Sequence, residues 1–290
     1  MPEVELLDKT EIWVRGITLD RTDLRSLAAA AARALDLSGD SVFVTDARAD
    51  HVVFDVLKPR AELASFVGRE AELLAVLGEV AGVTMSPRAS VHSRGVMGMI
   101  GAPSDEVDQI LSRATEIDEQ LRTYVSSRVA VISTGPEVVA GNVKDTNIAV
   151  ATDIMGAAGF EVTAAGAVLD NEDAIVGRVL RLTSEGFGVI ITTGGVGAED
   201  KDRTIEALQH CDPRLATAVL ATYPVGHGRH VKPHVRVGVG QVEWTRLIAL
   251  PGPTREVEAA LPVVVQGVQE GWGRRQLAQA LAASLRDCLR

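Results

Sequence analysis

Short runs of valine and isoleucine alternate with helical segments along the second half of the chain. Such runs predict strands at 129–132, 161–169 and 189–191, and the spacing between them predicts helices at 146–158 and 172–184. Strands that are apolar on both faces and are joined by helices are typical of a parallel sheet with helices on each side. The sequence therefore predicts a layered α/β domain over residues 127–290, with a helix at its C-terminal end.

The first 126 residues follow another order. Strands are predicted at 12–14, 42–44 and 52–56, and helices at 22–39, 61–79 and 104–124. In the first helix Leu24, Leu27 and Ala31 recur at three- and four-residue steps, which places them on one face. The order β-α-β-β-α is that of a small α+β domain of the ferredoxin-like kind. We therefore expect two domains, residues 1–126 and 127–290.

The charge balance limits the possible partners. The chain has 29 lysines and arginines against 39 aspartates and glutamates, a formal net charge of −10. A chain of this charge repels polyanions, so we expect no nucleic acid partner. A small phosphorylated ligand remains compatible, because backbone amides and a few local cations can hold one.

The apolar runs and the cysteines indicate where the protein works. The longest apolar runs fall well short of the roughly 18 residues that span a bilayer, and the start of the chain lacks the pattern of a signal peptide. Only Cys211 and Cys288 could form a disulfide, and neither has a neighbouring histidine or a CxxC partner. We therefore expect a cytoplasmic protein with no membrane contact and two unreactive cysteines.

The most informative segment is the glycine-rich turn Ile190-Ile-Thr-Thr-Gly-Gly-Val-Gly197. It follows a buried strand and precedes a helix, where glycine lets the backbone approach a phosphate and the helix start offers free N–H groups. The turn is neither a Walker loop nor the Rossmann fingerprint, because it lacks the Gly-Lys-Ser/Thr and G-x-G-x-x-G spacings. It is either an anion cradle or a tight strand-to-helix turn that simply requires glycine.

Other polar segments follow the neighbouring strands. Thr134-Gly-Pro-Glu137 comes after the first strand of this domain, Gly141 to Asn147 lead into its first helix, and Asp170 ends its second strand. Open α/β sheets bind ligands at the carboxyl ends of their strands, so these segments should share one crevice with the glycine turn. For Asp145, Thr146 and Asp170 the alternative is capping of the helix that follows.

Asp170 and Asp202 together are stronger evidence for a metal or phosphate site than either residue is alone. Carboxylates from different loops at one rim can bind Mg²⁺, neutralise a diphosphate or orient an attacking oxygen. This is the main help that phosphoryl or nucleotidyl transfer needs. The pair is therefore our candidate for both the metal site and the catalytic groups.

These motifs occur in a specific order. They are Thr134-Gly-Pro-Glu137, Asp145-Thr-Asn147, Val168-Leu-Asp170, Thr192-Thr-Gly-Gly-Val-Gly197, Asp202-Arg-Thr204 and Leu250-Pro-Gly-Pro253. Over residues 127–270 the series resembles the molybdopterin-binding domain family of molybdenum cofactor biosynthesis. That family includes molybdopterin adenylyltransferase and the N-terminal domain of the competence/damage-inducible protein A group. Val196, where adenylyltransferases usually carry threonine, makes the second group the closer fit.

The resemblance implies a three-layer α/β domain with a mostly parallel sheet and a pterin-phosphate or nucleotide site. By similarity, Asp170 and Asp202 fall on acidic positions associated with Mg²⁺-dependent chemistry. The candidate ligand-binding residues are Thr134, Gly135, Asp145, Asn147, Thr193, Gly194, Gly195, Gly197, Thr204, Pro251 and Gly252. The resemblance does not extend to residues 1–126.

Two functional hypotheses from different classes follow. The first is a Mg²⁺-dependent enzyme that acts on a phosphate or phosphoanhydride, either by adenylyl transfer between ATP and molybdopterin or by cleavage of a nucleotide sugar such as ADP-ribose. The second is a non-catalytic carrier or sensor of a pterin cofactor. By analogy with the family we expect a homo-oligomer, such as a trimer.

A cationic segment at 223–236 has three interpretations. It brings His227, His230 and His234 together with Arg229, Lys232 and Arg236 in an otherwise acidic chain. It could be a patch that faces phosphates, or a solvated loop or partly buried strand. A metal site is the third interpretation, although the histidine spacing fits no common zinc pattern.

Overall fold

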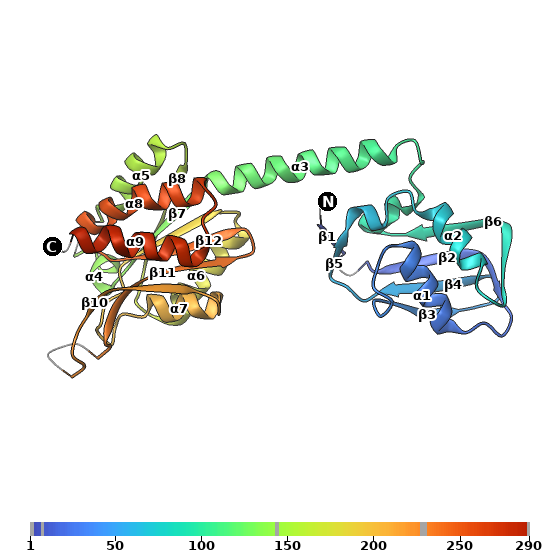
Figure 1. Ribbon diagram of the computed structural model, residues 1–290, viewed down its shortest axis with the longest axis horizontal. Coiled ribbons are helices and arrows are strands. Elements are labelled where there is room, and N and C mark those ends of the chain that lie inside the picture. Colours follow the sequence, from blue (N-terminus) through green and yellow to red (C-terminus); the bar gives the residue numbers. More distant parts are fainter. Residues whose placement is uncertain (1–2, 7–8, 143–144, 227–230, 289–290) are drawn as a thin grey trace. The chain divides into compact units, whose positions relative to one another are not determined.

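The computed structural model describes residues 3–6, 9–142, 145–226 and 231–288 (Figure 1). The chain divides into two compact units, Met1–Gln120 (unit 1) and Leu121–Arg290 (unit 2), and the division falls inside helix α3 (Val107–Ser127). Within the described residues, every helix is too short or too polar to traverse a bilayer.

Unit 1 is built on a four-stranded antiparallel sheet with the order β3-β4-β2-β6. Its elements are β1 (Glu3–Glu5), β2 (Glu11–Leu19), α1 (Leu24–Ala34), β3 (Val42–Ala47), β4 (His51–Val56), β5 (Arg60–Glu62), η1 (Leu63–Ser65), α2 (Glu70–Gly78), β6 (Val83–Ser93) and η2 (Gly95–Gly101). Strands β1 and β5 form a separate antiparallel pair. The order β2-α1-β3-β4-α2-β6 is that of a ferredoxin-like fold, which confirms the predicted α+β architecture.

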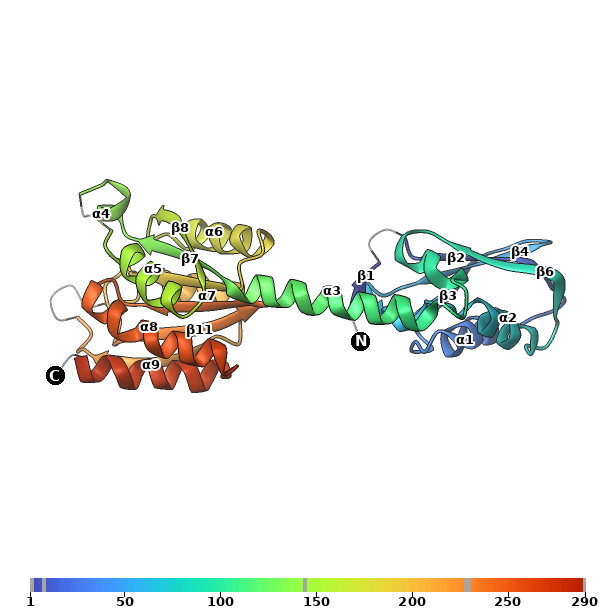
Figure 2. The same cartoon turned by 90° about the horizontal axis from the view of Figure 1, so that it is seen from above.

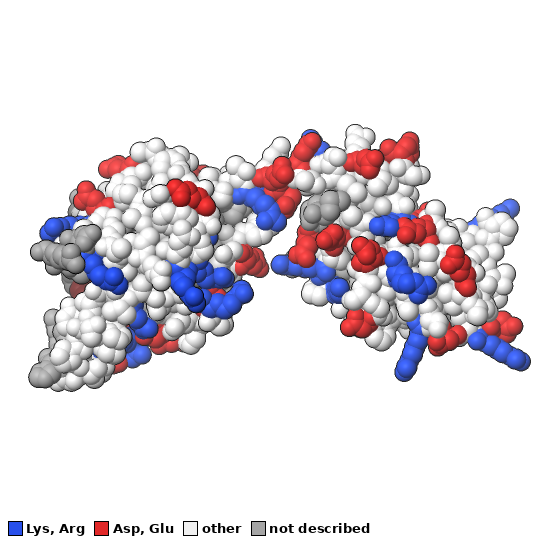
Figure 3. Space-filling view, in the orientation of Figure 1, with Lys and Arg blue, Asp and Glu red and all other residues white. Residues whose placement is uncertain are grey.

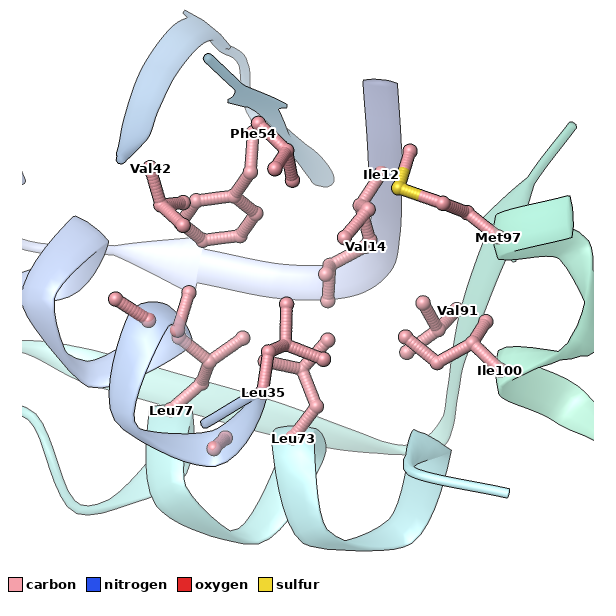
Figure 4. Packing of buried hydrophobic residues seen from close by; sticks show 14 of the residues in the cluster. Ile12, Val14, Leu35, Val42, Phe54, Leu73, Leu77, Val91, Met97 and Ile100 are labelled. Atoms are coloured by element: carbon pink, nitrogen blue, oxygen red, sulfur yellow. The ribbon is translucent and has the colours of Figure 1, made fainter. Parts of the chain in front are cut away.

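Helices α1 and α2 cover one face of this sheet, and the core lies between them and the strands (Figures 2 and 4). Ile12 and Phe54 on the sheet face Leu73 and Leu77 of α2, and all four side chains are fully buried. Burial of a side chain of this size contributes about 1.5–3 kcal/mol. Since successive strand residues point to opposite faces, Trp13 lies on the other side of the sheet.

The predicted helix over 61–79 is wrong in its first half. Only Glu70–Gly78 are helical, because β5 pairs with β1 and the short 3-10 turn η1 follows it. Gly68 then adopts a φ of +68°, which a helix does not allow, and a Cβ at this position would collide with the side chain of Val107. Tertiary pairing therefore overrides the apolar spacing in this segment.

Unit 2 is built on a six-stranded sheet with the order β10-β11-β12-β9-β7-β8. Its elements after α3 are β7 (Arg128–Thr134), α4 (Pro136–Val139), α5 (Asn147–Ala157), β8 (Glu161–Val168), α6 (Glu172–Ser184), β9 (Val189–Thr193), α7 (Thr204–Cys211), β10 (Ala216–Thr222), β11 (His234–Val242), β12 (Thr245–Leu250), α8 (Thr254–Gln269) and α9 (Arg274–Cys288). Strands β12, β9, β7 and β8 are parallel, whereas β10 and β11 add two antiparallel pairings. The predicted α/β class with a mostly parallel sheet is confirmed.

Helices cover both faces of this sheet (Figure 2). Helices α5, α8 and α9 pack with the sheet in one apolar cluster, and α6 and α7 pack with it in another. The central strand β9 is buried at every residue, as expected for a strand between two helical layers. This burial explains the continuous valine and isoleucine runs of the sequence.

The four parallel strands bring their carboxyl ends to one edge of the sheet, and hydrogen bonds connect the loops there. The Gly135 N–H donates to the Val168 carbonyl (3.1 Å), and the Gly194 N–H donates to the Leu250 carbonyl (3.0 Å). The loops after β7 and β8 are thus joined, as are the loops after β9 and β12. Residues far apart in the sequence meet at this edge.

Candidate functional site

A cavity of about 380 Å³ lies at this edge of unit 2. The predicted site residues that line it are Thr134, Gly135, Asp170, Gly194, Gly195, Gly197, Asp202, Pro251 and Gly252. They come from the loops that follow β7, β8, β9 and β12. The structure therefore places both aspartates beside the glycine turns in one cavity.

Three other predicted residues, Asp145, Asn147 and Thr193, line an adjoining cavity of about 210 Å³ that shares Thr134 and Gly252 with the first. The Asn147 backbone N–H donates to the Asp145 carboxylate (3.0 Å), and the Asn147 side-chain amide donates to the Gly252 carbonyl (2.9 Å). These contacts hold the start of α5 against the loop after β12. The three residues thus lie next to the main cavity rather than in it.

Thr204 lines neither cavity. Its fully buried hydroxyl donates to the Gly194 carbonyl (3.0 Å), and its backbone N–H donates to the Gly195 carbonyl (2.9 Å). Thr204 therefore supports the glycine turn from inside the fold.

The first residues of α5 and α6 show whether Thr146 and Asp170 cap these helices. Asn171, not Asp170, caps α6, since its side-chain oxygen accepts a hydrogen bond from the Ala174 N–H (3.0 Å). Thr146 occupies the cap position of α5 but makes no side-chain capping bond, and its hydroxyl lies 2.5 Å from that of Thr254. The capping interpretation is therefore wrong for Asp170, whose carboxylate lines the cavity instead.

The glycines of the turn leave room for the two carboxylates. A Cβ on Gly195 would collide with an Asp170 carboxylate oxygen and with the Thr204 hydroxyl. A Cβ on Gly197 would collide with the Asp202 carboxylate. Gly195 also has a φ of +62°, a conformation that favours glycine. The turn requires glycine because the acidic side chains pack directly against its backbone.

Asp170 is an unusual carboxylate. Its Oδ1 atom is buried and has no hydrogen-bond partner among the described residues. Burial raises the pKa of Asp170 to about 6, the Thr134 hydroxyl opposes this shift, and the charge of Asp202 adds to it. A buried polar atom without a partner is costly, and such atoms are often found where a ligand, ion or water binds.

Asp202 has a related environment. Burial is the largest cause that raises its pKa, and the Glu199 backbone N–H, which donates to Oδ2 (2.8 Å), opposes the shift. The Lys232 ammonium donates to the backbone carbonyl of Asp202 and thereby holds this loop in place. The coupling between the charges of Asp170 and Asp202 indicates that the two carboxylates act on one region of the cavity.

The sequence analysis missed three charged residues of the lining, Glu137, Lys201 and Glu256. Lys201 pairs with Glu137 (3.4 Å), and the pKa of Glu137 is lowered by its own backbone N–H and by this ammonium. Burial raises the pKa of Glu256, which lies in the first turn of α8. The available signal was proximity to the turns: Glu137 follows Gly-Pro directly, Glu256 lies three residues after Pro-Gly-Pro, and Lys201 lies four residues after Gly197.

The lining is strongly acidic. Its charged side chains are the carboxylates of Glu137, Asp170, Asp202 and Glu256 and the ammonium of Lys201. Among the described residues, no group of three or more histidine, cysteine or acidic side chains is arranged to hold a metal ion. An ion bound here would therefore take part of its coordination from a ligand or from water.

The cationic segment is only partly described, because His227, Arg229 and His230 lie outside the described residues. Lys232 and Arg236 both pair with Glu206, at 3.0 and 3.4 Å, and neither lines the cavity. The phosphate-facing patch therefore remains a prediction, since Lys232 also bonds to the carbonyl of the cavity residue Asp202. His234 and Arg236 lie in β11, which agrees with a partly buried strand.

Comparison with known proteins finds a family model that matches most of unit 2. Residues 130–270 match a family model described as "Probable molybdopterin binding domain". A CinA-like protein of Syntrophotalea carbinolica is 38% identical over 80 residues, which are 28% of this chain and 19% of that protein. A CinA-like protein of Thermomicrobium roseum is 37% identical over 100 residues, 32% of this chain and 24% of that protein. The chain thus spans about a fifth to a quarter of the length of these curated relatives.

Among solved structures, the molybdopterin biosynthesis enzyme MoaB of Thermus thermophilus is 26% identical. The alignment covers 49% of this chain and 94% of that one, with a TM-score of 0.38, so this likeness adds no weight to the family match. The predicted resemblance is confirmed by the family model and by the CinA-like relatives. Residues 130–270 thus match the molybdopterin-binding domain family, and parts of the chain are similar to CinA-like proteins.

Proposed function

We propose that the cavity of unit 2 binds a small phosphorylated ligand, a pterin phosphate such as molybdopterin or a nucleotide, and acts on its phosphate with Mg²⁺. The single observation that supports this most is the pair of partly buried carboxylates, Asp170 and Asp202, which pack against one glycine turn in one cavity. Asp170 and Asp202 would hold the ion.

The glycine turn offers suitable donors for a phosphate. The N–H groups of Gly195, Val196 and Gly197 have no hydrogen-bond partner within the described part of the chain. Successive backbone N–H groups in a glycine turn form an anion-binding concavity. The adjoining Gly194 N–H, by contrast, is used within the fold (3.0 Å to Leu250). The residues present therefore fit a phosphate group.

The charge of the cavity explains why a cation is part of the proposal. Four carboxylates and one ammonium line it, so a phosphate alone would be repelled. Mg²⁺ is commonly bound by one or two carboxylates together with substrate phosphates, and it neutralises the charge that develops in phosphoryl transfer. The buried, unpartnered Oδ1 of Asp170 is a donor atom available for such an ion.

The remaining residues would position the reactants. The turn N–H groups would orient the phosphate, and Lys201 would stabilise negative charge on its oxygens. This arrangement suits two reactions at phosphorus. In the first, water attacks the phosphoanhydride of ADP-ribose, which yields AMP and ribose 5-phosphate. In the second, a phosphate oxygen of the pterin attacks the α-phosphorus of ATP, the adenylyl group is transferred and pyrophosphate leaves. The family match favours a pterin as one ligand and does not distinguish these two reactions.

The test is incubation of the purified full chain with Mg²⁺ and either ADP-ribose or ATP plus molybdopterin. We expect AMP in the first case or adenylylated pterin in the second. Asp202→Asn should lower turnover by about 100-fold or more and leave the fold intact, since one metal ligand is lost. Asp200→Asn is the matched control, because Asp200 is on the same loop but pairs with Arg203 (2.8 Å) outside the cavity.

Two outcomes would change the proposal. Full Mg²⁺-dependent turnover in Asp202→Asn would show that this carboxylate has no such role. Tight binding of pterin by the wild-type chain, with no product under any condition, would favour the alternative of a carrier or sensor. Cytoplasmic location and assembly into a homo-oligomer remain predictions that are separate from this test.

A further inference from the structure

A second cavity, of about 600 Å³, lies in unit 1 on the sheet face that carries Trp13. Strands β2, β4 and β6 and the residues that flank them supply its lining, which includes Lys9, Trp13, Arg15, Asp55, His92 and Arg94. It has no residue in common with the cavity of unit 2. None of the motifs that carry the family resemblance falls in this region.

The charge of this cavity differs from that of its surroundings. Lys9, Arg15 and Arg94 line it and form no ion pair within the described part of the chain, and two carboxylates, Glu11 and Asp55, lie beside them. Residues 1–120 as a whole contain 12 lysines and arginines against 21 aspartates and glutamates. A cavity with more cations than carboxylates in so acidic a unit indicates an anionic ligand.

The Trp13 indole provides an aromatic surface in the same cavity. The His51 ring stacks on it, with 5.5 Å between the ring centroids and 22° between the ring planes. The indole N–H donates to the Glu11 carboxylate (3.1 Å). His51 does not line the cavity, so these two contacts fix the indole while the ring remains part of the cavity wall. Fixed aromatic rings beside cations are typical of sites that stack a nucleobase.

Asp55 adds a specific polar group. Its Oδ1 atom is buried and has no hydrogen-bond partner among the described residues, although the residue lines the cavity. A carboxylate oxygen in this state accepts a hydrogen bond from a ligand N–H at little cost, because it has already lost its water. Exocyclic amino groups and ring N–H groups of nucleobases are such donors.

We infer that unit 1 binds a nucleoside phosphate in this cavity. The base stacks on Trp13 and donates a hydrogen bond to Asp55, and the phosphate lies among Lys9, Arg15 and Arg94. The inference does not depend on the function proposed for unit 2, because the two cavities are lined by different residues.

The test measures the fluorescence of Trp13. Full-length protein with Trp244→Phe and Trp272→Phe retains Trp13 as its single tryptophan, and AMP is titrated without Mg²⁺ while indole fluorescence is followed. We expect saturable quenching, with adenosine and inorganic phosphate each binding at least ten-fold more weakly than AMP. Arg94→Ala and Asp55→Asn should each raise the Kd about ten-fold, whereas Arg88→Ala should not, because Arg88 lies in β6, the strand that ends just before Arg94, but outside the cavity.

Three results would overturn this inference. The first is the absence of quenching by AMP at millimolar concentration, and the second is equal affinity for AMP in the wild type and in Arg94→Ala/Asp55→Asn. The third is binding of a short oligoadenylate at least 100-fold more tightly than AMP, which would assign the face to single-stranded nucleic acid. These binding measurements do not depend on whether unit 2 has enzymatic activity.

A separate observation concerns α3. Six of its eight apolar residues follow a three-four spacing, and they are Val107, Ile110, Ala114, Ile117, Leu121 and Tyr124. The other two, Leu111 and Val125, lie beside this seam. No residue of α3 is buried, and Ile117, Leu121 and Tyr124 are 54%, 47% and 56% exposed. This is the period of a coiled-coil seam, in which these residues would occupy the a and d positions, and it extends here over about two and a half heptads.

The flanking charges indicate a second copy of this chain as the occupant of the seam. Arg113 pairs with Glu116 of its own helix (3.3 Å). In a parallel, in-register pair, Arg113 at a g position would in addition lie opposite Asp118 at the e position of the other helix, and the reverse pair would form by symmetry. The geometry therefore points to self-association of the chain through α3 as a parallel coiled coil.

Light scattering coupled to size exclusion tests this second inference. The wild type should be oligomeric, and Ile117→Asp should reduce the mass to that of a monomer. Ser112→Asp is the matched control, since it adds the same charge at an exposed position outside the seam and should leave the mass unchanged. A monomeric wild type, or an oligomer of unchanged mass in a correctly folded Ile117→Asp variant, would exclude the coiled coil.

Discussion

The two units place their polar chemistry on different parts of a sheet. In unit 2 the candidate site lies at the carboxyl edge of parallel strands, where four loops meet. In unit 1 the second cavity lies on the face of an antiparallel sheet, where side chains of neighbouring strands stand side by side. A site made of loops can bring backbone N–H groups to a ligand, whereas a site on a sheet face offers only side chains.

The units also differ in charge. Residues 1–120 contain 12 basic and 21 acidic residues, whereas residues 121–290 contain 17 and 18. Acidic side chains are spread over the face of unit 1 that Figure 3 presents. The excess negative charge of the chain thus belongs almost entirely to unit 1, yet the more acidic cavity is the one in unit 2. The local arrangement of charges, and not the total, decides what each cavity can bind.

The largest expected change is in the free energy of unfolding of a single unit. It tests our proposal that residues 1–126 and 127–290 fold as separate domains. Phe54→Ala removes a fully buried ring from the core of unit 1 and should destabilise that unit by about 3–5 kcal/mol. In denaturant titrations followed by amide exchange, unit 1 should unfold earlier and unit 2 should keep its midpoint. Leu281→Ala, from the core of unit 2, should give the reverse pattern. Simultaneous loss of both units in either variant would contradict independent folding.

The next effect concerns the backbone of the unit 2 site. Gly195→Ala should destabilise the protein by about 2–4 kcal/mol and abolish ligand binding, because the Cβ would displace Asp170 and strain the left-handed backbone. Gly141→Ala is the control, since its φ of +71° is similar but its Cβ would meet no atom within 4 Å. It should cost about 1 kcal/mol. Equal costs for the two substitutions in thermal denaturation would show that Asp170 does not pack against the turn.

The smallest effect concerns the pH dependence of stability in metal-free protein. The folded pKa of Asp170, about 6, is above its ordinary value of 3.8, so the ionised form is disfavoured in the folded state. Its favourable contribution is complete below pH 3.8 and is lost as the pH rises through 6. Asp170→Asn should therefore stabilise the apoprotein at pH 7 by about 1–2 kcal/mol, after allowance for partial exposure.

The same comparison at pH 4 should show almost no difference between Asp170→Asn and the wild type. Asp153→Asn, at an exposed position of α5, serves as the control and should give a pH-independent change below about 0.5 kcal/mol. A stabilisation by Asp170→Asn that is equal at pH 4 and pH 7 would contradict the assigned pKa. Chemical denaturation at the two pH values provides the measurement.

Much of the fold could be predicted from local patterns, and the exceptions have identifiable causes. The valine and isoleucine runs of β7 and β9 predicted a sheet covered on both sides, because such burial requires apolar residues at every position. The helix expected over 61–79 failed in its first half, where β5 pairs with β1. That pairing joins segments more than fifty residues apart, and apolar spacing carries no information about it.

The candidate site shows the same limit. The order of the glycine and aspartate motifs predicted which loops meet, since the ends of parallel strands share an edge. It did not predict that Glu256 also lines the cavity, that Thr204 stays behind the turn, or that Asn171 rather than Asp170 caps α6. These distinctions depend on side-chain directions and on contacts between distant segments.

The sequence by itself determined the layered class of unit 2, the loops that form its crevice and the family that this region resembles. These features follow from residue types at fixed spacing, which act locally. Only the tertiary structure decided that Asp170 has a raised pKa and an unpartnered oxygen, and that Trp13, Asp55 and Arg94 line one cavity. Desolvation and charge coupling depend on every atom nearby, and folding brings those atoms together from distant parts of the chain.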